Sequence, residues 1–123
     1  VARLGGIYGK GRIIGTSLLA RDESVPGTGQ EYLNLIHGYD AAQALLRMKK
    51  SAFWGKKFVV TDGNPVQRKV YYNYLAEKLG YERPVFSGED RNSYKCDSQN
   101  TWAKLRITPK FGDYRAGLRD LIG

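Results

Sequence analysis

Residues 3–12, with the sequence RLGGIYGKGR, decide how the rest of this chain is interpreted. Together with Ala2 they contain an apolar segment, Ala2 to Tyr8, that is typical of a buried β-strand. Gly9 and Gly11 follow at its end, and glycine lets a backbone turn sharply or approach a ligand closely. The stretch therefore predicts a strand that leaves the core through a glycine-rich turn.

Strands and helices alternate along the rest of the chain. Short apolar runs at 32–36 and 57–61 predict strands, and apolar residues at helical spacing predict a helix after each of them. We expect Asp40 to cap the first of these helices, Pro65 to lie early in the second, Gly80 to end it and Asp113 to cap a final helix. The alternation predicts an α/β fold with a few short, partly parallel strands.

Five blocks of sequence, taken in order, resemble the extended short-chain dehydrogenase/reductases, the NAD-dependent epimerase/dehydratase family. They are the turn at 3–12, LIHGYDAA at 35–42, FVVTDGNP at 58–65, the helix ending in Leu79-Gly80 with Pro84-Val85-Phe86 after it, and Asn100 with YRAGL at 114–118. In that family such blocks lie in the second half of a Rossmann-like domain. The resemblance implies that residues 1–123 form the C-terminal, substrate-side portion, whose N-terminal dinucleotide-binding half is elsewhere or absent.

The motifs that bind the cofactor and transfer protons in this family are not found in the chain. A dinucleotide site needs G-x-G-x-x-G between a strand and a helix, and the glycines at 5–11 lack that spacing. Of nine tyrosines only Tyr74 has a lysine four residues on, Lys78, and we expect that pair to be a packed ring beside a solvated ammonium. We therefore predict no catalytic residue here and no NAD(P) binding by this chain alone. NAD or NADP would bind if the N-terminal half is present.

Four residues are candidates for binding. The resemblance implies that Tyr8 and Gly9 pass beside the nicotinamide of the cofactor. Arg12 ends the same turn and could hold a phosphate or carboxylate, or be a surface arginine. Lys10 replaces the proline usual in the family, which loosens the turn and adds a charge. Arg68, early in the second helix, could face a substrate pocket or the solvent.

His37 and Cys96 are the only histidine and the only cysteine. Asp40 follows His37 closely, which could indicate a general base, but a strand end and a helix start at this position favour a structural imidazole bonded to nearby backbone. A single cysteine excludes an internal disulfide and a cysteine-based zinc site. No His, Cys, Asp and Glu cluster has metal-ligand spacing, so no metal is predicted.

The chain is strongly basic and carries two adjacent exposed-looking aromatic residues. Lys and Arg number 20 against 12 acids, a formal charge of +8, which favours an anionic partner. The basic residues are dispersed without the aromatic interleaving of RNA-binding domains, so nucleic acid is the less favoured partner. Phe53 and Trp54 are hard to bury together, and we expect at least one of them to contact another chain.

Two main hypotheses of function follow. One is a partial NAD(P)-dependent epimerase/dehydratase-like protein, active only when an N-terminal Rossmann half completes it. The other is a non-catalytic architectural subunit of a larger assembly. A third, a basic nucleic-acid-associated protein, would show a steep salt dependence. No apolar window approaches ~20 residues, so no transmembrane segment is expected. A soluble protein of a reducing compartment or an organelle interior is compatible with one cysteine.

Overall fold

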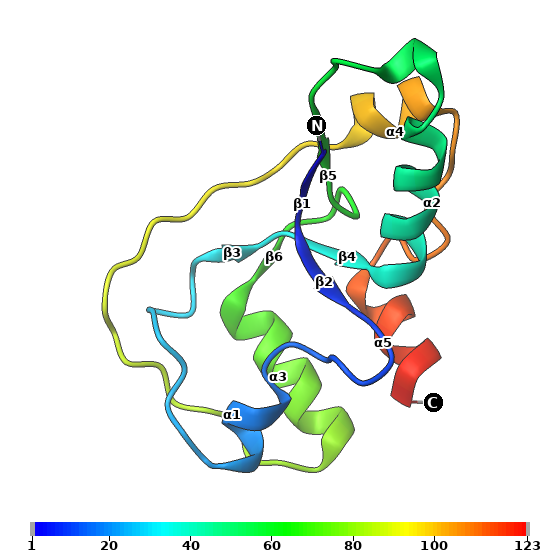
Figure 1. Ribbon diagram of the computed structural model, residues 1–123. Helices are drawn as coiled ribbons and strands as arrows, with labels where there is room; N and C mark the ends of the chain where they lie inside the picture. Colours follow the sequence, from blue (N-terminus) through cyan, green and yellow to red (C-terminus); the bar gives the residue numbers. More distant parts are fainter. Residues whose placement is uncertain (1, 123) are drawn as a thin grey trace. The chain divides into compact units, whose positions relative to one another are not determined.

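The computed structural model describes residues 2–122, and the chain divides into two compact units (Figure 1). Unit 1 combines residues 1–12, 34–65 and 96–123. Unit 2 combines residues 13–33 and 66–95. Each unit is built from segments that are distant in the sequence, so neither could fold from one continuous stretch.

The strands of unit 1 form two parallel pairs. β1 (Ala2–Leu4) pairs with β5 (Phe58–Val60), and β2 (Gly6–Tyr8) pairs with β4 (Leu35–His37). The single strand expected over 2–8 is thus split at Gly5, and this part of the prediction was wrong. The reason lies in the close approach of Asn34, whose carbonyl oxygen would lie 2.5 Å from a Cβ at position 5. The backbone changes its neighbour here: Gly5 N donates to Val60 O, and Gly6 N donates to Asn34 O.

Three α-helices and one 3₁₀ turn complete unit 1. They are α2 (Gly38–Met48), η1 (Ser51–Phe53), α4 (Gln99–Leu105) and α5 (Tyr114–Ile122). A core cluster lies between α2, α4 and the strands, and its buried members are Ile36, Ala41, Ala44, Phe58, Val60, Trp102 and Leu105. Asp40 does not cap α2, because the helix already begins at Gly38 and the ring of His37 accepts from Tyr39 N.

Unit 2 packs two helices with one antiparallel strand pair. Its elements are α1 (Thr16–Ala20), β3 (Tyr32–Leu33), β6 (Val66–Gln67) and α3 (Arg68–Leu79), with β3 paired to β6. Pro65 does not lie in the first turn of α3, because two residues of β6 separate it from the helix. Gly80 ends α3 in the left-handed conformation with a φ of 78°, which confirms the predicted end of the helix.

The remaining expectations concern the C-terminal third. Residues 87–98 contain no helix or strand, and α4 begins at Gln99. Asp113 caps α5 as expected, since its side chain accepts from Arg115 N at 2.7 Å. The predicted α/β class, with short and partly parallel strands alternating with helices, is confirmed. Within residues 2–122, no helix combines the length and the apolar character needed to cross a membrane.

Candidate functional site

The glycine-rich turn at the end of β2 is closed by its own backbone. Gly9 N donates to Arg12 O and Arg12 N donates to Gly9 O, both at 2.9 Å. Gly11 has a φ of 78°, the conformation that a type II turn requires at its third residue and that glycine adopts without strain. Lys10 therefore occupies the second position of a turn held by Gly11, and its side chain is exposed. The turn persists without the proline.

Tyr8 points into unit 1. Its side chain is 1 % exposed, and its ring lies edge-on to His37 with 5.3 Å between the ring centroids. The hydroxyl lies against Gly117 of α5, where an added Cβ would come within 2.0 Å of it. Burial, together with the nearby carboxylates of Asp62 and Asp40, raises the pKa of Tyr8 above its usual range. The hydroxyl thus stays protonated at every physiological pH.

His37 has the structural role that its position in the sequence favoured. Its Nδ1 accepts from Tyr39 N at 3.0 Å, so this nitrogen carries no proton and caps α2. The other nitrogen, Nε2, lies 3.4 Å from Asp120 Oδ2, and the ring stacks on Phe111 with 4.1 Å between centroids. With Nδ1 occupied by the helix end, the lone pair that a general base would use is engaged in the fold.

Asp40 holds the segment before α5 against α2. Its two carboxylate oxygens accept from the backbone of Lys110 and of Phe111, each at 2.8 Å. Because Phe111 is the residue that stacks on His37, this carboxylate also fixes the imidazole. Sequence reasoning assigned Asp40 to a cap and did not find this contact across seventy residues of chain.

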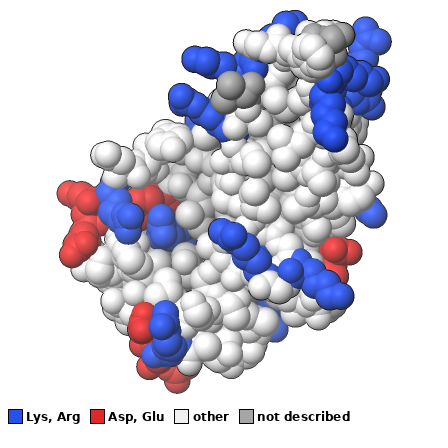
Figure 2. Space-filling view, in the orientation of Figure 1, with Lys and Arg blue, Asp and Glu red and all other residues white. Residues whose placement is uncertain are grey.

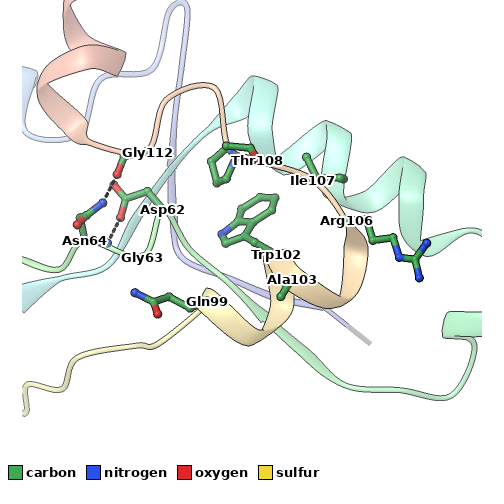
Figure 3. Close-up of a pocket in the computed structure, with 11 residues that line it drawn as sticks. Asp62, Gly63, Asn64, Gln99, Trp102, Ala103, Arg106, Ile107, Thr108 and Gly112 are labelled. Carbon is green, nitrogen blue, oxygen red and sulfur yellow. Dashed lines mark hydrogen bonds between the residues drawn. The ribbon is translucent and has the colours of Figure 1, made fainter.

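Asp62 lies at the edge of a cavity of about 570 Å³ in unit 1 (Figure 3). The side chain is 5 % exposed: Oδ1 accepts from Asn64 N at 2.8 Å, and Oδ2 is buried without a hydrogen-bond partner among the described residues. Burial raises the pKa of Asp62 to about 7. The residues that line the cavity include Asn64, Gln99, Trp102, Arg106 and Gly112.

The cavity is held in shape by hydrogen bonds from its own wall. Asn64 Nδ2 donates to Gly112 O, and Trp102 Nε1 donates to Thr61 O at 2.8 Å. Figure 3 shows the indole of Trp102 standing between Asp62 and the segment Ile107–Thr108. The wall combines a carboxyl group, two amides, a guanidinium, a hydroxyl and an indole face, so it can offer both donors and acceptors to a small polar molecule.

The two arginines predicted for a substrate belong to different units. Arg12 is an exposed residue of unit 1 at the end of the turn. Arg68 begins α3 in unit 2, where it is half-buried and hydrogen-bonds the hydroxyl of Tyr72. Burial raises the pKa of Tyr72, and the guanidinium opposes that rise. Arg68 therefore has a packing role, whereas Arg12 is free to meet a ligand; binding by either stays a prediction.

Phe53 and Trp54 differ in their surroundings. Phe53 is half-buried and lies edge-on to Phe58 with 5.9 Å between centroids, so it extends the core of unit 1. Trp54 is 71 % exposed, and its indole N–H donates to Lys49 O at 2.8 Å. Of the two, Trp54 is the residue available to another chain.

The residues described here do not by themselves fit a dinucleotide. The pyrophosphate of such a cofactor is usually held by unpaired backbone N–H groups at a helix N-terminus, but Gly9 N donates to Arg12 O and Arg12 N donates to Gly9 O. A Cβ added at Gly9 would meet open space, so this face of the turn is accessible, while the ring of Tyr8 is not. Residues 2–122 also contain no group of three or more His, Cys, Asp and Glu that could hold a metal ion.

Comparison with solved structures gives the fold. A conserved protein of unknown function from Silicibacter pomeroyi is 24 % identical, with a TM-score of 0.77, and a UDP-glucose 4-epimerase from Thermotoga maritima, solved with UDP-glucose, is 23 % identical with a TM-score of 0.75. The human epimerase family protein SDR39U1, solved with NADPH, is 18 % identical with a TM-score of 0.79. The chain has an epimerase fold.

The likeness covers nearly all of this chain but less than half of each neighbour. Each of the three matches takes in 99 % of the 123 residues, and 47 %, 44 % and 47 % of the respective solved chains. No family model and no curated protein matches the sequence. The resemblance drawn from five sequence blocks is thus confirmed for the fold, and the epimerase fold is present here over about half the length that the neighbours have.

Proposed function

We propose that this chain is the substrate-side portion of an NAD(P)-dependent epimerase/dehydratase-like protein, which acts only together with a dinucleotide-binding half. The observation that supports this proposal most directly is the extent of the structural match. It covers 99 % of this chain but less than half of each neighbour. One of these neighbours was solved with UDP-glucose and another with NADPH. The second half would supply the cofactor cradle and the proton-transfer pair.

The turn at Tyr8–Arg12 is the part of this chain that we assign to the reaction. Its open face at Gly9 allows a ligand to approach the backbone closely, and Arg12 offers a forked donor to a phosphate or a carboxylate. Tyr8 contributes by anchoring: its buried ring ties the start of the turn to α5 through Gly117. The turn is therefore a positioned wall of a binding site whose reacting groups lie on other residues.

The native state of the polypeptide tests this proposal. Purification from the source, followed by mass measurement of the intact protein and of its companions, should give either a longer polypeptide or a partner with a dinucleotide-binding motif. In that completed protein, Arg12→Gln should raise KM for an anionic substrate about tenfold or more, as the loss of a charged hydrogen bond does, with Lys10→Gln as the matched control. A native mass near 13.8 kDa without such a companion would refute the enzymatic proposal.

A second candidate, an architectural subunit without catalysis, is favoured by one observation. Trp54 is 71 % exposed in the connector between α2 and β5, and exposed Trp side chains often anchor protein interfaces. An assembly partner over this residue would explain it. The two candidates separate experimentally, because the subunit would co-purify with partners and show no turnover under any combination of cofactor and sugar nucleotide.

A further inference from the structure

The whole net charge of this chain resides in two segments. Residues 41–61 and 98–112 contain eight of the twenty Lys and Arg residues and none of the twelve Asp and Glu residues, so together they carry a formal charge of +8. The rest of the sequence has twelve basic and twelve acidic residues and is balanced. The basic residues look dispersed along the sequence, but the excess of positive charge is concentrated in these two segments.

Both segments belong to unit 1, where they meet at one end. The first contains most of α2, all of η1 and all of β5, and the second contains α4 and the chain after it. α2 packs against α4. Figure 2 shows Lys and Arg side chains gathered where Figure 1 places these elements, with no acidic side chain among them on that face. We call this surface the basic end.

The basic end contains a groove with a volume of about 530 Å³. Its walls combine cationic, aliphatic and polar side chains. The lining residues are Gln43, Leu46, Arg47 and Lys50 from α2 and its end, and Arg106, Ile107 and Thr108 from the chain after α4. None of the ion pairs among the described residues involves Arg47, Lys50 or Arg106. The groove therefore presents three cations that form no ion pair with a carboxylate of residues 2–122.

Trp54 and Leu46 add exposed apolar surface at the same end. Trp54 is 71 % exposed and Leu46 is 56 % exposed. The indole is fixed by its hydrogen bond to Lys49 O, at the end of α2, and by its neighbour Phe53, which packs on the core. Fixed aromatic side chains lose little entropy on binding, and for that reason they often anchor interfaces.

We propose that the basic end binds an acidic, amphipathic segment of a partner protein. Carboxylates of the partner would pair with Arg47, Lys50 and Arg106, since guanidinium groups match carboxylates with two parallel hydrogen bonds. Apolar side chains of the partner would cover Leu46 and Trp54. This inference does not depend on whether the chain takes part in a reaction.

Two other anionic partners fit this surface less well. Single-stranded nucleic acid is bound by grooves in which successive bases stack on several aromatic residues, and here one exposed indole lies beside a groove with aliphatic walls. A lipid surface is met by apolar side chains that protrude from a flat or convex face, whereas Leu46 lines a hollow. Cations and aliphatic groups that alternate around a groove match a polypeptide best.

A charge-reversal experiment tests the proposal on the purified protein. The probe is a fluorescently labelled peptide of alternating Glu and Leu, with a single-stranded oligonucleotide and phosphatidylserine vesicles as competing ligands. The variant Arg47→Glu with Arg106→Glu removes the groove cations, and Arg83→Glu with Arg91→Glu makes the same change of charge on exposed sites of unit 2. Circular dichroism confirms that each variant is folded.

We expect the groove pair to weaken peptide binding about tenfold or more and the control pair about twofold or less, because only the former removes direct contacts. Trp54→Ala should also weaken peptide binding, although it leaves the net charge of the protein unchanged. If both pairs of substitutions weaken peptide binding equally, the effect comes from net charge alone, and the proposal is overturned. Tighter binding of the oligonucleotide or the vesicles than of the peptide would overturn it as well, and so would an absence of peptide binding.

Discussion

Asp62 in unit 1 and Glu31 in unit 2 are equally buried, yet their environments treat the same functional group in opposite ways. Each is 5 % exposed. Glu31 accepts from the backbone of Thr28 and Gly29 and from the Thr28 hydroxyl, and these bonds lower its pKa. Asp62 accepts from Asn64 N alone, and burial raises its pKa to about 7. Burial favours the protonated form of both carboxyl groups, and only the several donors around Glu31 outweigh it.

The difference follows from the local sequence. Glu31 ends a Pro-Gly-Thr-Gly-Gln-Glu loop in which Gly27 and Gly29 have φ values of 109° and 93°, so the backbone can curl its N–H groups around the carboxylate. Asp62 comes soon after β5, and the loop that follows offers its side chain one backbone donor, Asn64 N. Glu31 therefore anchors its loop in unit 2 through backbone hydrogen bonds. Asp62 lies at the edge of a cavity in unit 1, where burial disfavours its charged form.

The largest effect in this comparison is expected for Glu31→Gln. The amide is neutral and brings two N–H donors to a place where backbone N–H groups already point at the side chain, so bonds are lost and donors are opposed. The thermal midpoint should fall at pH 7, and calorimetry checks it. Because the folded pKa is lowered, the wild-type advantage should be present above pH about 4.5 and disappear as the pH falls through the folded value. A variant as stable as wild type at pH 7 would contradict the anchoring role.

Asp62→Asn should instead stabilise the protein. The folded state holds a proton on Asp62 that the unfolded state has released between pH about 4 and 7, so stability falls as the pH rises through that window. The neutral amide avoids this cost. We expect a gain of about 4 kcal/mol in the free energy of unfolding at pH 8, which corresponds to a pKa of about 7 in place of 3.8, and a gain near zero at pH 4. Urea titrations at the two pH values measure both; a loss at pH 8 would show that the carboxylate is stabilised by contacts other than those described.

Tyr8→Phe should give a smaller gain. The Tyr8 hydroxyl is buried without a hydrogen-bond partner among the described residues and lies against Gly117. Removing it relieves a desolvation cost and should raise the free energy of unfolding by about 1 kcal/mol. The same change should reduce the penalty of Gly117→Ala, whose new Cβ would collide with the hydroxyl. Additive effects of the two substitutions in a double-mutant cycle would rule out this contact.

The smallest effect is expected for Thr28→Val. The hydroxyl of Thr28 lies 3.3 Å from Glu31 Oε2, a long contact beside three hydrogen bonds of 2.9–3.1 Å from two backbone donors, Thr28 N and Gly29 N. The backbone bonds to Glu31 remain in the variant, and the bond from Gln30 N to the hydroxyl that is also lost is solvent-exposed, so the thermal midpoint should stay close to that of wild type. A fall as large as that of Glu31→Gln would mean that the hydroxyl, not the backbone, holds the carboxylate.

Sequence reasoning succeeded where the deciding contacts are local. The ends of helices at Gly80 and Asp113 and the backbone-bonded imidazole of His37 depend on neighbours within a few residues, and all three were predicted. The split at Gly5 and the reach of Asp40 to Phe111 depend on partners thirty to seventy residues away, which periodicity does not reveal.

The candidate site divides in the same way. The turn at 8–12 was recognised from its glycines, because turn chemistry is written in adjacent residues. The burial of Tyr8 against Gly117 and of Asp62 beside its cavity was missed, because each requires knowledge of what packs on the strand from the far end of the chain. A glycine inside the final helix pattern, Ala116-Gly117-Leu118, was the one signal of close packing that the sequence offered.

The measurement that tests the central claim most directly is a calorimetric titration of this chain with NAD⁺ and with NADPH. The chain has an epimerase fold, but the N–H groups of Gly9 and Arg12 in its glycine-rich turn already donate to carbonyl oxygens of that turn, and the ring of Tyr8 is buried. The account predicts no binding of either cofactor at micromolar concentration to the folded chain. Saturable micromolar binding of NAD⁺ or NADPH would contradict it.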